Sequence, residues 1–271
     1  MKKIIAILAV LALVVTCFAA CGGKTTTEDK ATGSDAPTTA AIVENPGETS
    51  ADALVMGTNA AFPPYEFVAE DGSYAGIDVE IANAVAAKLG KTVEVKDMEF
   101  DSLIPAVAGG SIDFVMAGLT VTDERKETVD FSDTYATGVQ VIIVKEDSEI
   151  ASVDDLEGKK IGVQAGTTGD IYVTDEFGQE NVSQYNNGSL AVQALLNDQI
   201  DCVVIDNEPA KNFVAANEGL KILETEYVTE DYAAAFSKEN TELRDQFNAA
   251  LAELIADGTV QSIVDKYITA E

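Results

Sequence analysis

The chain has 271 residues, with 47 acidic against 17 basic side chains, no histidine, and a formal net charge of −30 at pH 7. Because nucleic-acid binding depends on basic patches, this charge argues against nucleic acid as a partner. The lack of histidine excludes histidine acid–base catalysis and the usual histidine-containing zinc sites. We therefore expect no catalytic residue, no metal and no other cofactor.

The first twenty residues are typical of a secretion signal. Two lysines precede an apolar run at residues 4–15, which is too short for a comfortable membrane span. The run leads into FAACGG at residues 18–23, which resembles the lipobox of bacterial lipoproteins. That resemblance implies that residues 1–20 are a lipoprotein signal peptide and that Cys21 becomes a lipid-modified N-terminus. The alternative is a plain cleaved signal with an incidental cysteine.

Residues 21–50 predict a flexible tether between the lipid and the folded part. This segment is rich in Thr, Ala, Gly and acidic residues, contains two prolines, and has no aromatic residue. Such a composition does not bury enough apolar surface to offset the entropy of ordering. Beyond it the sequence has a single cysteine, Cys202, which lies in an apolar strand and excludes an intramolecular disulfide there. We expect Cys202 to be a small buried hydrophobic residue.

From residue 51 onward, alternating β and α segments predict an α/β protein with helices covering a parallel or mixed sheet. The main predicted strands are residues 54–58, 92–96, 112–115, 138–144, 160–164 and 202–205. The main predicted helices are residues 78–89, 102–108, 190–197, 209–217, 242–256 and 260–267. The pattern divides into two comparable runs, and each opens with a strand that enters a Gly-Thr turn. Because ligands of open α/β sheets bind at the carboxyl ends of strands, two such lobes facing each other predict a cleft.

The sequence MAGLTVTDER at residues 116–125 follows a short apolar strand and suits the carboxylate of a free amino acid. It combines backbone N–H groups near Gly118, the hydroxyl of Thr120 and the guanidinium of Arg125. A planar and permanently charged arginine pairs bidentately with a carboxylate. The alternative is an ordinary surface arginine that pairs with Asp123 or Glu127.

Two aromatic residues and one acid complete the predicted cleft. Phe62 lies in AAFPPYEF, where two prolines deny the chain regular structure and project neighbouring side chains from a rigid loop. Phe100 follows a strand, so the two rings are placed to sandwich an aliphatic or cationic side chain, unless they belong to the core. Asp206 ends an apolar strand, where its carboxylate suits an ammonium group or the N-cap of the next helix.

The chain from about residue 54 to 268 resembles the family 3 solute-binding proteins, the amino-acid-binding subunits of polar amino acid ABC transporters. The shared stretches are GTNAAFPPYEF, GIDVEIANAVAAKLG, FDSLIPAVAGGSIDFVMAGLTVTDERKETVDFSDTY, KKIGVQAGTTGDIY and AVQALLNDQIDCVVIDNEPA. The resemblance implies a periplasmic-binding-protein-like fold, with two α/β lobes joined by a two-crossing hinge and the ligand in the inter-lobe cleft. Lobe 1 would comprise residues 51–143 plus 233–271 and lobe 2 residues 144–232. The crossings would lie near residues 141–146 and 228–235.

The resemblance also implies a role for each matching residue. Arg125 would hold the ligand α-carboxylate with help from Thr120 and from N–H groups near Gly118 and Thr168, and Asp206 would hold the α-ammonium. The remaining implied ligand-binding residues surround the ligand side chain: Phe62 and Phe100 flank it, and Asn59, Ala117 and Gln164 line the pocket. Basic-amino-acid binders and the glutamine binder often carry Asp at the position of Asn59, so the ligand's identity stays open.

We therefore expect the substrate-binding subunit of an amino acid ABC importer, not an enzyme. It would be a monomer that is lipid-anchored to the outer face of the cytoplasmic membrane and delivers a free L-amino acid to the permease transmembrane subunits. The two rings and the nearby acids Glu66 and Asp78 favour arginine or lysine as the ligand, slightly over a neutral polar amino acid. The amides of Asn59 and Gln164 suit a neutral polar amino acid such as glutamine.

Two other readings of the sequence stay open. One is a lipoprotein sensor or adhesin that binds an amino acid without transport. The other is an enzyme like the cyclohexadienyl dehydratases that share this fold, with Glu66 or Asp78 as the catalytic carboxylate.

Overall fold

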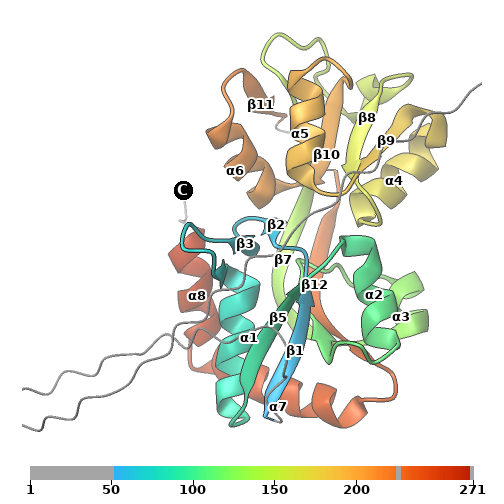
Figure 1. Ribbon diagram of the computed structural model, residues 1–271. Coiled ribbons are helices and arrows are strands. Elements are labelled where there is room, and N and C mark those ends of the chain that lie inside the picture. The colour runs from blue at the N-terminus through green and yellow to red at the C-terminus, as the bar shows by residue number, and fades with distance from the viewer. Residues whose placement is uncertain (1–51, 224–226, 269–271) are drawn as a thin grey trace, which may run out of the picture. The chain divides into compact units, whose positions relative to one another are not determined.

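The computed structural model describes residues 52–223 and 227–268, which form a nine-stranded mixed sheet, a small three-stranded sheet and the helices that cover them (Figure 1). The predicted signal peptide, Cys21 and the tether lie outside the described residues. The strands are β1 (Ala53–Thr58), β2 (Ala61–Phe62), β3 (Glu66–Val68), β4 (Tyr74–Ala75), β5 (Thr92–Asp97), β6 (Phe114–Val115), β7 (Val129–Lys145), β8 (Ile161–Gln164), β9 (Val182–Tyr185), β10 (Cys202–Asp206), β11 (Leu220–Ile222) and β12 (Thr229–Ser237). The α-helices are α1 (Ile77–Lys88), α2 (Phe100–Ala108), α3 (Asp123–Thr128), α4 (Thr168–Phe177), α5 (Gly188–Leu196), α6 (Asn207–Ala216), α7 (Thr241–Ala256) and α8 (Thr259–Tyr267). None of these described helices is long and apolar enough to cross a membrane.

The large sheet consists of two halves that share the long strand β7. Residues of β7 up to Val139 pair with β12, and residues from Gln140 onward pair with β10. One half has the order β5-β1-β6-β12-β7, and the other has β7-β10-β8-β9 with β11 also paired to β7. We call the first half with α1, α2, α3, α7 and α8 lobe 1, and the second half with α4, α5 and α6 lobe 2. This is the two-lobed arrangement that the sequence predicts.

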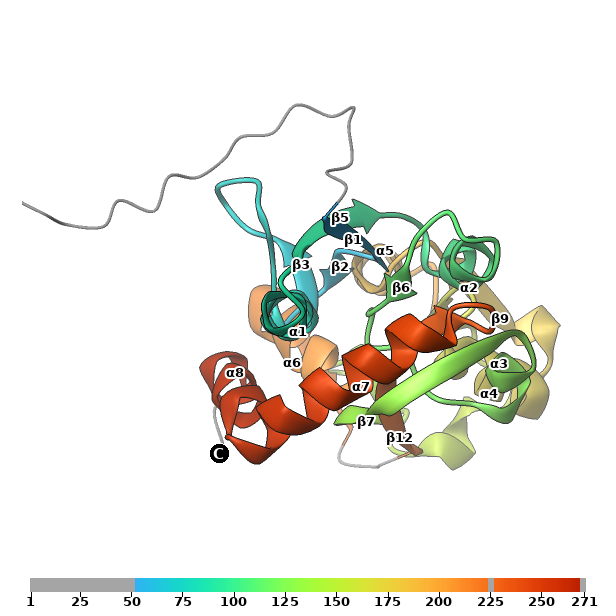
Figure 2. The same ribbon diagram turned by 90° about the horizontal axis from the view of Figure 1, so that it is seen from below.

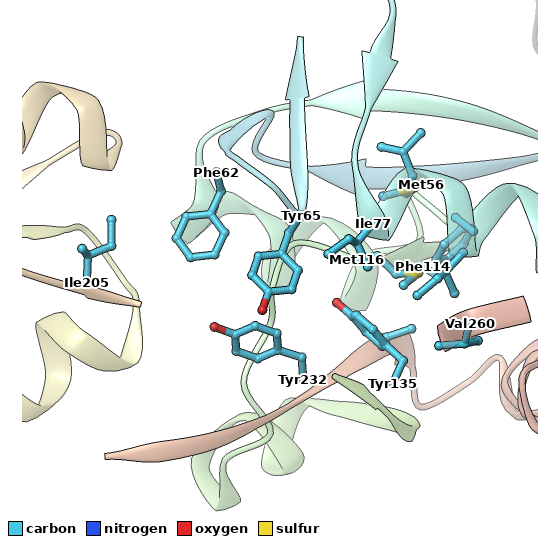
Figure 3. Packing of buried hydrophobic residues seen from close by; sticks show 14 of the residues in the cluster. Met56, Phe62, Tyr65, Ile77, Phe114, Met116, Tyr135, Ile205, Tyr232 and Val260 are labelled. Carbon is cyan, nitrogen blue, oxygen red and sulfur yellow. The ribbon is translucent and has the colours of Figure 1, made fainter. Parts of the chain in front are cut away.

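The apolar strands are covered on both faces, which explains why they read as nearly continuous hydrophobic runs. In β1, Leu54 and Met56 belong to one apolar cluster, whereas Val55 between them belongs to another. In lobe 1, α1 and α7 pack on one side of the sheet and α2 on the other (Figure 2). Figure 3 shows Met56 and Phe114 within the first cluster, which continues toward the tyrosines beside the cleft.

Two chain segments connect the lobes side by side. The Gln140 N–H donates to the Val228 carbonyl at 2.8 Å, and the Tyr227 N–H donates to the Gln140 carbonyl at 2.9 Å. The returning segment therefore pairs with β7 at the level where β7 passes from one lobe to the other. The boundaries at residues 143/144 and 232/233 stay a prediction.

The structure differs from the sequence prediction at two places. Strand β7 has 17 residues, so it extends far before the apolar run at 138–144 that predicted it. The prediction that the double proline denies regular structure is wrong for the residues that flank it. Ala61 and Phe62 of β2 pair with Phe67 and Glu66 of β3, because only the turn between the strands contains the prolines.

Candidate ligand-binding site

A cavity lies between the lobes at the carboxyl ends of β1, β6, β8 and β10, where open α/β sheets bind their ligands. Its lining residues come from both lobes: Phe62, Glu66, Phe100, Ala117, Gly118, Thr120, Arg125, Gln164, Thr167, Thr168 and Asp206. Every predicted ligand-binding residue except Asn59 is among them. Glu66 and Thr167 are additional to the predicted set.

Arg125 lies in helix α3 with its guanidinium directed at the cavity and held on three sides. Its Nη1 donates to the Thr120 carbonyl at 2.7 Å, and its Nη2 donates to the Gly166 carbonyl of lobe 2 at 3.1 Å. The guanidinium carbon lies 5.6 Å from the centre of the Phe100 ring, within the range of a cation–π contact. The side chain is therefore pre-positioned, which lowers the entropic cost of binding an anion.

The alternative of a surface ion pair for Arg125 is wrong. Arg125 is only 7 % exposed, and within residues 52–223 and 227–268 no carboxylate forms an ion pair with it. The neighbouring Lys126 is the residue that pairs with Asp123, at 3.1 Å on the surface. A buried and unpaired guanidinium at a cavity wall favours an anionic ligand group.

Backbone donors complete an anion site beside Arg125. Thr120 forms an isolated antiparallel bridge with Tyr232, in which the hydrogen bonds belong to the flanking residues. The Thr120 N–H is consequently not used in that bridge. From lobe 2, Thr168 is the first residue of α4, where helical N–H groups have no intrahelical partner and the helix dipole favours negative charge. The hydroxyl oxygens of Thr120 and Thr168 are 3.4 Å apart across the cleft.

The expected free N–H of Gly118 is not available. It donates to Asp78 Oδ2 at 2.8 Å, so a side chain of α1 holds the loop that carries Thr120. Gly118 has a φ of +53°, and a Cβ there would lie 2.8 Å from the Phe62 ring. Glycine is therefore required for the close approach of this loop to Phe62. Gly118 and Ala117 still line the cavity.

Asp206 provides the opposite charge at the cavity. It is 6 % exposed and accepts a hydrogen bond from the Tyr232 hydroxyl, which lies next to Tyr65 in Figure 3. Burial, and then the charge of Glu230, raises the pKa of Asp206 to about 7. Its side chain makes no capping hydrogen bond to α6, so the N-cap alternative is not realised. A buried carboxylate without a cation favours a ligand ammonium.

Replacing Asp206 with Asn is expected to remove a pH dependence of stability. The pKa is about 7 in the folded protein and near 3.8 in an unfolded chain. Between these values the folded state retains a proton that the unfolded state has lost, so the free energy of unfolding falls as pH rises, by up to about 1.4 kcal/mol per pH unit. Urea unfolding of both proteins across this range, without amino acid, measures the difference. A difference that is constant with pH would contradict the assignment.

Two further buried acids lie close to the site, and one of them, Glu66, lines the cavity. Glu66 is 1 % exposed, and its side chain interacts with a second acid, Asp78, while no basic side chain pairs with it in the part of the chain that the structure describes. Burial, and then Asp78, raises the pKa of Glu66 well above its ordinary value. Asp78 is fully buried and accepts from Gly118 and from the Tyr135 hydroxyl, and burial raises its pKa to about 6. Both acids are therefore buried groups of the protein interior and not solvated surface charges.

Asn59 and Gln164 bond to each other across the cleft. Gln164 Nε2 donates to Asn59 Oδ1 at 3.0 Å, and Asn59 Nδ2 donates to the Met98 carbonyl at 2.8 Å. The Asn59 amide thus has a protein partner for both its nitrogen and its oxygen, and it is not among the residues that line the cavity. Only Gln164 of this pair lines it.

Both predicted phenylalanines line the cavity, but they are held differently. Phe62 is buried and stacks with Tyr65, with ring centres 5.9 Å apart and planes at 27°. Phe100 lies against the Arg125 guanidinium. Phe62 therefore provides an aromatic wall for the ligand, and Phe100 supports the guanidinium of the anion site.

Sequence reasoning missed Glu230, a buried acid of β12 next to the site. Glu230 Oε2 accepts from Thr120 Oγ1 at 3.1 Å and from Gln140 Nε2 at 3.0 Å. It thereby links lobe 1 to the connecting strands. No local signal predicts this role, because Glu230 lies in a segment read as a plain crossing, and its partners are distant in sequence.

Comparisons with known proteins agree with this architecture. Residues 54–270 match the family model of bacterial extracellular solute-binding proteins, family 3. The arginine-binding extracellular protein ArtP of Bacillus subtilis is 36 % identical over 233 residues, which cover 83 % of this chain and 89 % of ArtP. A probable histidine-binding protein of Neisseria gonorrhoeae is 35 % identical over 277 residues, which cover 100 % of this chain and 97 % of the relative.

Solved structures give the same result. An ancestral arginine-binding protein bound to glutamine shares 42 % identity and a TM-score of 0.77, covering 82 % of this chain and 100 % of its own. An ancestral arginine-binding protein bound to arginine is 43 % identical with a TM-score of 0.76, and the match covers 80 % of this chain and 98 % of that protein. The chain belongs to family 3 of the bacterial extracellular solute-binding proteins, and the predicted family and fold class are confirmed.

Proposed function

We propose that this protein captures a free amino acid, with a basic one preferred, between its lobes and delivers it to the permease of an ABC importer. The observation that carries the proposal is that one cavity is lined by a buried guanidinium and a buried carboxyl group, neither of which forms an ion pair among the described residues. Arg125 and the N-terminus of α4 suit an α-carboxylate, and Asp206 suits an α-ammonium. Arg125 belongs to lobe 1, whereas the N-terminus of α4 and Asp206 belong to lobe 2. A ligand that contacts both lobes therefore favours the closed state.

Glu66 supports a basic side chain. A buried carboxyl group at the cavity wall that neighbours a second acid, Asp78, and no base is stabilised by a ligand cation more than by any neutral group. The names of the relatives point the same way, since they include arginine-binding and histidine-binding proteins. The ancestral protein bound to glutamine supports a neutral polar amino acid as the second choice.

A thermal-shift screen of the twenty amino acids tests the proposed function. A ligand that binds only the folded state raises the unfolding midpoint by mass action. We expect the largest increase with arginine, lysine or histidine, a smaller one with glutamine, and none with glutamate, whose second carboxylate would face Glu66. If no amino acid raised the midpoint, the proposal would be wrong.

We infer a lipid anchor at Cys21 from the lipobox-like sequence, although Cys21 lies outside the described residues. Changing Cys21 to Ala is expected to release the protein into the medium without altering ligand affinity, because the tether separates the anchor from the lobes. Fractionation of cells followed by calorimetry on the released protein measures both effects. Retention of the variant in the membrane fraction would contradict the anchor.

We further propose that the protein is a monomer and takes no part in catalysis, in keeping with relatives that are named as binding proteins. A sensor or adhesin would bind the same ligand without transport. Uptake of labelled arginine that requires both this protein and a permease distinguishes import from those functions. Binding without such uptake would favour the sensor.

A further inference from the structure

The small sheet of β2, β3 and β4 carries part of the cavity wall, although it is separate from the large sheet. Its strands have only two or three residues each and form a sheet of their own. So small a sheet needs packing against helices to be stable. Phe62 of β2 and Glu66 of β3 both line the cavity. The residues that hold the small sheet in place therefore determine where Glu66 meets a ligand.

Tyr267, in the last described helix α8, packs against the strand that carries Glu66. Successive side chains of a strand point to opposite faces, so Phe67 points away from the cavity that Glu66 lines. The half-buried ring of Phe67 meets the Tyr267 ring edge to face, with centres 6.2 Å apart and planes at 78°. Aromatic pairs with this geometry contribute more than their buried area alone. Tyr267 therefore supports β3 from the side opposite the cavity.

The same tyrosine is attached to helix α1, which lies beside α8 in Figure 1. The Tyr267 hydroxyl donates a hydrogen bond to Glu80 of α1, and the backbone of Gly76 interacts with this hydroxyl as well. Gly76 directly precedes α1, the helix that contains Asp78, and Asp78 is the acid that neighbours Glu66. One side chain from the far end of the sequence thus connects β3 to the start of α1.

We propose that Tyr267 is a positioning residue that sets the preference for a basic ligand by holding Glu66 at the cavity. The inference rests on the proposed function, because it concerns the same ligand side chain. Tyr267 is not among the residues that line the cavity, so it acts through β3. Fixing β3 before the ligand arrives lowers the entropic cost of the contact between Glu66 and a cation. A neutral side chain makes no such ion pair, so its affinity depends less on the position of Glu66.

Calorimetric titration of the full chain with arginine and with glutamine tests the inference, with thermal unfolding as a check on folding. We expect Tyr267→Ala to lower the ratio of arginine affinity to glutamine affinity by about three- to tenfold. Tyr267→Phe keeps the ring against Phe67 and should preserve the ratio within about twofold. Equal losses for the two ligands in Tyr267→Ala would show a merely structural role and overturn the inference.

Two further comparisons make the result specific to Glu66. Lys266→Gln removes the neighbouring exposed ion pair with Glu80 but leaves the aromatic contact, so the ratio should stay within about twofold of the wild type. In a Glu66→Gln background, Tyr267→Ala should no longer change the ratio, because the carboxylate that it positions is absent. A change of the same size in that background would contradict the assignment.

Hydrogen exchange without ligand tests the contact independently of binding. Residues 61–75 should exchange faster in Tyr267→Ala than in the wild type, whereas Lys266→Gln should leave their exchange unchanged. Unchanged exchange in Tyr267→Ala would overturn the inference, whatever the protein binds. Failure of the wild type to bind any amino acid would instead overturn the proposed function.

Discussion

Replacing Arg125 with Ala is expected to weaken binding of every amino acid by at least about a hundredfold. The change removes the buried guanidinium that faces the α-carboxylate, and no other Arg or Lys side chain is among the residues that line the cavity. A hydrogen bond to a charged group contributes roughly 1.5–3 kcal/mol, and a bidentate pair contributes more. Calorimetric titration with arginine and with glutamine measures the loss.

Two further variants make that result specific. Arg244→Ala removes another partly buried arginine, which pairs with Asp130 at 2.7 Å and is not among the cavity residues, so affinity should stay unchanged. Arg125→Lys keeps the charge but loses the planar guanidinium. Its affinity for amino acids should lie between those of the wild type and Arg125→Ala. Affinity in Arg125→Ala equal to the wild type, with the fold intact, would remove Arg125 from the site.

The second large effect concerns the ligand side chain. Glu66→Gln is expected to weaken arginine binding by at least about a hundredfold, whereas glutamine affinity should change by less than about tenfold. The reason is that breaking a buried ion pair costs roughly 3 kcal/mol or more, and glutamine has no charge to pair with Glu66. Glu70→Gln, on the exposed part of the same hairpin, is the matched control and should not distinguish the ligands.

Proton release gives an independent check on the role of Glu66. Because burial raises the pKa of Glu66, the group holds a proton until a cation displaces it. Arginine binding should therefore release protons, and glutamine binding should release fewer. Calorimetry in buffers with different ionisation enthalpies measures the release. Equal proton release for both ligands would contradict contact between Glu66 and the arginine side chain.

The order of elements is predictable from the sequence because it follows from local patterns. Amphipathic segments and turn residues placed α1, α7 and α8 within about two residues of their observed bounds. The residues before Gly138 in β7 are not predicted as a strand. They are polar or exposed at several positions and form a strand because β12, which is distant in the sequence, pairs with them.

The site shows the same division between local and tertiary information. Arg125 and Asp206 are predictable from local sequence, because Arg125 lies in the short helix α3 that follows the loop after β6, and Asp206 ends β10. The pairing of Asn59 with Gln164, and the use of the Gly118 N–H by Asp78, depend on residues that are 105 and 40 positions apart. The sequence alone suggests ligand contacts for two amides, Asn59 and Gln164, and for two acids, Glu66 and Asp78. Only the folded arrangement shows which of their groups have protein partners.

A crystal structure of the protein with arginine is the most direct test of the central claim. We expect the α-carboxylate to accept hydrogen bonds from the Arg125 guanidinium and the Thr120 N–H, and the α-ammonium to lie within hydrogen-bonding distance of Asp206. The ligand guanidinium should contact Glu66. Arginine bound elsewhere, or in the cavity with its carboxylate away from Arg125, would contradict the account.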